Sequence, residues 1–126
     1  MPVTYARDDE HRRVTLTLVD PYTVDDTFRL VERQAAERAW QYGALVDARA
    51  IAEPIRSADV RALVDRVRHL TMTYGRRGPV AMLTAQPVMF GVARMYATLS
   101  EGVGVRVAVF TDVALAGRWL DEQRDA

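Results

Sequence analysis

The sequence predicts an α/β fold, with a mostly parallel sheet wound as a four-fold βα superhelix and an antiparallel hairpin at the N-terminal end. Short apolar runs typical of strands alternate with longer stretches whose apolar residues recur at helical spacing. This alternation occupies all 126 residues, with no internal repeat, low-complexity segment or linker. A chain of this length with 49% hydrophobic residues can form one core. Residues 1–126 are therefore expected to be a single domain.

The first elements are two strands and a helix. Residues 14–18 alternate apolar and polar side chains, which is typical of a strand with one buried face, and residues 5–7 are its expected antiparallel partner across a turn at residues 8–11. Thr23 and Asp26 have the spacing of a capping box. An apolar stripe that begins at Val24 then predicts a helix ending near Trp40.

The middle of the chain predicts a buried strand and a long helix. Residues 44–46 are apolar without alternation, as expected of a central strand that is covered on more than one side. Ser57 is the expected N-cap of a helix whose apolar residues extend from Val60 to Tyr74.

The last third of the chain repeats the pattern twice. A strand at residues 80–83 precedes a helix that opens at Gln86-Pro87. A final strand presents Val107 and Val109 on one face, and Asp112 is the expected cap of the last helix.

The end of the chain contains Val107-Ala108-Val109-Phe110-Thr111-Asp112, then Ala114, Ala116 and Trp119-Leu120, and the predicted third helix contains Phe90-Gly91-Val92-Ala93-Arg94-Met95-Tyr96. With these motifs and the order of its elements, nearly the whole chain resembles the SpoIIAA-like proteins, which belong to the STAS (sulfate transporter and anti-sigma antagonist) and Sec14-like grouping. The resemblance implies a sequentially wound mixed sheet with helices mostly against one face. It also implies a domain that binds a protein partner or a small ligand.

In the anti-sigma antagonists of this grouping, a serine at the start of a helix after a central strand is phosphorylated. Ser57 is the serine at such a place, and a helix N-terminus suits a phosphate. The chain departs from the family pattern here, because nine residues separate Asp47 from Ser57 and no second serine or glycine adjoins it. A capping role for Ser57 is the competing interpretation.

Composition excludes several classes of function. All 17 basic residues are arginine, 17 acidic residues balance them, and the pI near 6.7 disfavours nucleic-acid binding. Cys is absent, and we find no nucleophile elbow, dinucleotide fingerprint, Walker A sequence or metal-ligand spacing. We therefore predict no enzyme activity, no cofactor and no metal. Residues 1–5 lack the features of a secretory signal and no stretch could span a membrane, so we expect a cytoplasmic protein without membrane insertion.

Charge is distributed unevenly along the chain. Residues 66–106 contain six arginines and one acid, a net charge of +5, whereas residues 1–65 carry −3 and residues 107–126 carry −2. The positive segment either attracts a small anionic ligand or an acidic partner, or is a by-product of arginine-rich composition.

Four residues are candidate contacts for a ligand or partner. Asp47 stands at the carboxyl end of a predicted strand, as do Asp20, Thr84 and Asp112. Ligand and partner sites of open α/β sheets usually lie at these ends. Phe90 and Arg94 lie on the expected outer face of the third helix, and Arg106 lies in the positive segment.

The sequence favours a non-enzymatic binding domain that acts through protein–protein contact as a regulatory or scaffold module. The alternative is a carrier or sensor of an apolar or amphipathic anionic ligand, by analogy with the Sec14-like proteins. Methionine and aromatic side chains of the predicted third helix could form an apolar surface, so we also expect a homodimer.

Overall fold

A computed structural model of the chain describes residues 3–125. Five strands form one sheet in the order β1-β2-β3-β4-β5. The strands are β1 (Val3–Asp8), β2 (Arg13–Val19), β3 (Gly43–Ala50), β4 (Val80–Leu83) and β5 (Val107–Phe110). The helices are α1 (Val24–Ala36), α2 (Ser57–Tyr74), α3 (Pro87–Glu101) and α4 (Val113–Asp125). None of these helices is long and apolar enough to cross a membrane.

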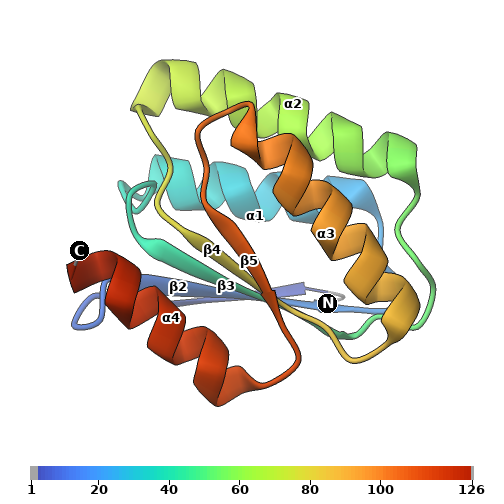
Figure 1. Cartoon of the computed structure of the whole chain (residues 1–126). Coiled ribbons are helices and arrows are strands. Elements are labelled where there is room, and N and C mark those ends of the chain that lie inside the picture. The colour runs from blue at the N-terminus through green and yellow to red at the C-terminus, as the bar shows by residue number, and fades with distance from the viewer. Residues whose placement is uncertain (1–2, 126) are drawn as a thin grey trace.

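The sheet is mixed, as the sequence predicts. β1 and β2 form the antiparallel hairpin, with Tyr5 opposite Leu16, and each later strand pairs in parallel with the one before it. Right-handed crossovers between sequential parallel strands place the intervening helices on one face. Figure 1 shows α1, α2 and α3 on that face. The terminal helix α4 is not a crossover, and it packs on the opposite face against β3, β4 and β5.

The two faces of the sheet carry separate cores. On the face with three helices, β2 contributes Val14, Leu16 and Leu18, all of them buried. On the other face, Leu45 of β3 packs with Leu120 of α4. Since its neighbours Ala44 and Val46 belong to the first core, β3 is covered on both sides, which confirms the interpretation of its unbroken apolar run.

Helix boundaries agree with the sequence at some ends and not at others. The Thr23 and Asp26 capping box is present, Pro87 is the first residue of α3, and the carboxylate of Asp112 accepts hydrogen bonds from the first turn of α4. The expectation that α1 reaches Trp40 is wrong. The helix ends at Ala36, because Arg38 adopts a left-handed conformation with φ of 62° that turns the chain.

The prediction that Ser57 is an N-cap is also wrong. Ser57 is the first residue of α2, and the extended residue before it, Arg56, is the cap. The Arg56 carbonyl accepts the backbone N–H groups of Asp59 and Val60 at 3.0 and 3.1 Å. No side chain caps this end, so the Ser57 hydroxyl has no capping role.

Two loops cross at the amino ends of β3 and β4. The Gly78 backbone N–H donates to the Trp40 carbonyl at 2.9 Å, and the Trp40 indole N–H donates to the Gly75 carbonyl at 2.8 Å. A Cβ atom at Gly78 would overlap the backbone carbonyls of Gln41 and Tyr42. The crossing therefore requires glycine at position 78, because any side chain would push the two loops apart.

Substituting this glycine tests the crossing. We expect Gly78→Ala to lower the free energy of unfolding by roughly 3 kcal/mol, because the overlap is with backbone and cannot be relieved by a rotamer change. The matched control is Gly91→Ala in α3, where a Cβ meets nothing within 4 Å. That control should stabilise the protein by about 0.5–1 kcal/mol through helix propensity. Urea denaturation measures both, and equal effects would contradict the assigned packing.

Candidate functional site

An arginine-lined pocket lies at the amino ends of the parallel strands. Its volume is about 360 Å³. Six lining residues are arginines, and none of the lining residues that the structure describes is acidic. The lining consists of His11, Arg12, Arg13, Gln41, Gly43, Arg76, Arg77, Gly78, Pro79, Arg106, Leu120, Gln123 and Arg124, and we call this the arginine pocket.

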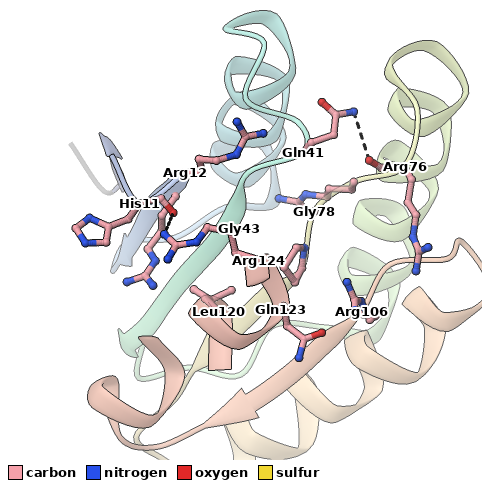
Figure 2. A pocket seen from close by; sticks show the side chains of 13 residues that line it. His11, Arg12, Gln41, Gly43, Arg76, Gly78, Arg106, Leu120, Gln123 and Arg124 are labelled. Carbon is pink, nitrogen blue, oxygen red and sulfur yellow. Dashed lines mark hydrogen bonds between the residues drawn. The ribbon is translucent and has the colours of Figure 1, made fainter. Parts of the chain in front are cut away.

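The topology explains why residues so far apart in sequence meet here. Each parallel strand begins at this end of the sheet, so the residues just before β2, β4 and β5 are brought together. Those residues include Arg12, Arg76 and Arg106. The helix α4 runs back from the far end of β5 and adds Arg124 from its last turn. Figure 2 shows these four side chains coming from separate segments around the opening.

Two of the arginines are held by contacts within the protein. Arg13 donates to the Asp121 carboxylate at 2.8 Å and to the Gly117 carbonyl at 3.0 Å. Arg124 donates to the His11 carbonyl at 3.1 Å and lies 4.0 Å from the same Asp121 carboxylate. These bonds fasten α4 to the hairpin, so part of the positive charge in the pocket has a structural role.

Three others, Arg12, Arg76 and Arg106, line the pocket and are exposed. Arg12 contacts the ring of Tyr42 at 5.2 Å, and Arg76 uses its Nε to donate to the Gly104 carbonyl at 3.0 Å. No carboxylate that the structure describes forms an ion pair with Arg12, Arg76 or Arg106. The arrangement therefore offers guanidinium donors to an anion from outside the chain.

The sixth arginine, Arg77, has its side chain in the interior and is only 4% exposed. Its guanidinium donates to Gln34 Oε1 at 3.0 Å and to the Tyr96 hydroxyl at 3.4 Å, and it stacks over Trp40 at 5.0 Å. Burial lowers the pKa of this guanidinium. None of these partners is a carboxylate, so the buried charge adds to the positive potential beneath the pocket.

The side chains that line the pocket are mainly guanidinium groups, with a single imidazole. Its lining contains no serine, threonine or carboxylate, and its one imidazole, His11, lies 2.7 Å from the carboxylate of Asp8 in the hairpin turn. The His11 hydrogen bonds lower the pKa of Asp8. Among residues 3–125, no group of three or more metal-ligating side chains is close enough to hold a metal ion.

The candidate contacts from the sequence are dispersed in the structure. Arg106 alone lies in the arginine pocket. Asp47 forms an ion pair with Arg49 at 2.9 Å in β3, and the hydrogen bonds from Arg49 lower the pKa of the Asp47 carboxyl group. Phe90 and Arg94 pack on each other on the outer face of α3, with the guanidinium 5.9 Å from the ring centre. Ser57 is exposed at the start of α2.

A second cleft of about 750 Å³ lies beyond the carboxyl ends of β2 and β3, and of the residues expected at the carboxyl ends of the strands it includes Asp20 but not Asp47, Thr84 or Asp112. Its charged lining residues are Asp20, Glu53, Arg56 and Asp59. Asp20 accepts the Ala52 backbone N–H at 2.9 Å, and Asp59 lies 3.6 Å from Arg56. Three acids and one arginine thus give this cleft a net negative charge, in contrast to the arginine pocket.

Sequence reasoning missed Arg12, Arg13 and Arg124, because they lie in segments with a net negative charge. The positions of the arginines relative to the strands could have indicated the pocket. Arginines lie at the start of three of the four parallel strands or within four residues before it: Arg12-Arg13 at β2, Arg76-Arg77 before β4 and Arg106 before β5. Because parallel strands begin at the same end of a sheet, arginines placed at their starts are expected to lie close together, which the net charge of a chain segment does not reveal.

Comparison with protein-family models, with curated proteins and with solved structures gives no match for this chain. The arginine pocket is therefore interpreted from its own geometry and charge.

Substitutions at Arg77 test its structural role. Arg77→Ala should lower the free energy of unfolding by about 2–4 kcal/mol, because it leaves a cavity and removes the partners of Gln34 and Tyr96. Arg77→Met fills the space and removes the buried charge, so it should cost less than half as much. Chemical denaturation gives both values. If methionine proves as damaging as alanine, the guanidinium bonds matter more than the volume.

Proposed function

We propose that the protein is a non-enzymatic binding domain that holds an anionic group of its partner in the arginine pocket. The observation that carries this proposal is the convergence of Arg12, Arg76 and Arg106 without an ion pair to any described carboxylate. Placing like charges together is unfavourable, so a binding role gives a reason for their arrangement. Guanidinium groups bind phosphate and carboxylate through paired hydrogen bonds, which suits them to this role.

The size of the pocket is consistent with a compact anionic group. A volume of about 360 Å³ is many times the roughly 10–15 Å³ that one water molecule needs, and the opening faces solvent. The apolar cavity between α2, α3 and the sheet has only about 30 Å³, far less than the arginine pocket. This difference favours an anionic group on a partner over an amphipathic ligand of the Sec14-like kind.

The resemblance to SpoIIAA-like domains supports the same proposal, because those proteins act through contact with protein partners. On this basis we propose a regulatory or scaffold role in the cytoplasm. Self-association is a further proposal, supported by the exposed side chains of Met72, Val88, Val113 and Leu115, and sedimentation velocity measures it directly.

Titration with pyrophosphate tests the anion site. Arg12→Gln and Arg106→Gln should each weaken binding about tenfold, which corresponds to about 1.4 kcal/mol, because each removes a charged donor. Arg94→Gln is the matched control, since it makes the same charge change on the outer face of α3, outside the lining. Calorimetry and amide chemical shifts report binding.

The control separates a site from general attraction. If Arg94→Gln weakens binding as much as Arg106→Gln, the protein attracts anions through its overall field and the proposed site is wrong. Absence of any pyrophosphate or phosphate binding at low ionic strength would also contradict the proposal.

A further inference from the structure

A groove continues the arginine pocket along the free edge of the sheet. The groove has a volume of about 490 Å³, and Arg76, Arg106 and Gln123 line both it and the pocket. Its remaining lining residues are Glu101, Gly104, Val105, Val107, Ala108 and Trp119. The groove therefore runs from the cluster of arginines onto the backbone of β5.

The backbone of β5 has unpaired polar groups along this groove. Arg106 and Phe110 direct their carbonyls inward, to the backbone N–H groups of Val80 and Thr84 at 2.8 and 2.9 Å. Because backbone groups of successive strand residues point to opposite sides, those of Val107, in the groove, and of Val109, just beyond its lining, face outward. In residues 3–125 no strand lies beyond β5. Figure 1 shows β5 at this edge, between α3 and α4.

The side chains along the edge indicate what could pair with it. Exposed edges are often protected by a charged residue, a proline or a bulge, and the sequence of β5, Val-Ala-Val-Phe, has none of these. The half-buried Trp119 packs on Phe110 with ring centres 5.9 Å apart and forms an apolar wall. At the amino end of β5, the charged residues that line the groove are two arginines, Arg76 and Arg106, and one acid, Glu101.

We propose that β5 binds an extended, acidic segment of a partner protein by strand addition, with an acidic side chain of that segment in the arginine pocket. This inference rests on the proposed function, because it uses the pocket as the anchor. Main-chain hydrogen bonds to Val107 and Val109 would supply affinity, and the arginines would fix direction and register. A second copy of β5 fits less well, because its four residues include no carboxylate and the nearest one after them, Asp112, already caps α4.

Short peptides test the edge directly. The probes are acetyl-Glu-Glu-Val-Thr-Val-Thr-amide and acetyl-Thr-Val-Thr-Val-Glu-Glu-amide, which place the acids in the pocket for parallel and antiparallel pairing respectively. We expect one of them to bind and to shift the amide signals of residues 106–110 as well as those of the pocket. Arg106→Gln should weaken this binding at least tenfold, and Arg94→Gln should leave it unchanged.

Two N-methylated versions of the binding peptide report on main-chain pairing. Methyl groups on alternate amides block either the N–H groups that face β5 or those that face away. One version should bind at least tenfold more weakly than the parent, and the other should bind like it. Equal affinity of both versions, or shifts confined to the arginine pocket, would overturn strand addition.

Pyrophosphate binding measured in parallel separates this inference from the proposed function. If pyrophosphate binds and neither peptide does, the edge proposal is wrong and the anion site stands. If neither pyrophosphate nor peptide binds, both are wrong. A concentration-dependent dimer whose signals at residues 106–110 shift without peptide would assign the edge to a second copy.

Discussion

The buried guanidinium of Arg77 is the interaction on which the pocket end of the molecule depends. It bonds to Gln34 of α1 and to Tyr96 of α3, and it covers Trp40 in the loop between α1 and β3. The next residue, Gly78, makes the close backbone contact with that same loop. One short segment thus holds two helices and a neighbouring loop. It keeps the loops in the positions from which the exposed arginines reach the opening.

The orientation of the helices explains why side chains must provide the positive charge. In a parallel α/β sheet, anions usually bind at the carboxyl ends of the strands, where helix N-termini supply N–H groups and positive dipoles. The arginine pocket lies at the other end, where α1, α2 and α3 finish and present carbonyls. Arg7 donates to the Glu37 carbonyl at 2.7 Å and Arg76 to that of Gly104, so arginine also neutralises these helix ends.

Most of the fold follows from local patterns in the sequence, and most of the site does not. The unbroken apolar run at residues 44–46 and the capping residues Thr23 and Asp112 predict their elements correctly, because each pattern depends on neighbours along the chain. The end of α1 depends on Arg38 in a left-handed conformation, which arginine does not signal. The pocket depends on which strand ends lie side by side, and a charge sum over consecutive residues cannot report that.

The two ends of the sheet differ in charge, although the chain as a whole has a formal net charge of zero. The arginine pocket occupies one end, and the cleft with Asp20, Glu53 and Asp59 occupies the other. Between these two sites the local field is positive at the pocket and negative at the cleft, so an acidic surface is attracted to the first and repelled by the second before contact. Encounters with an acidic partner would therefore begin with the pocket turned toward that partner. This pre-orientation raises the association rate at low ionic strength and fades as salt screens the field.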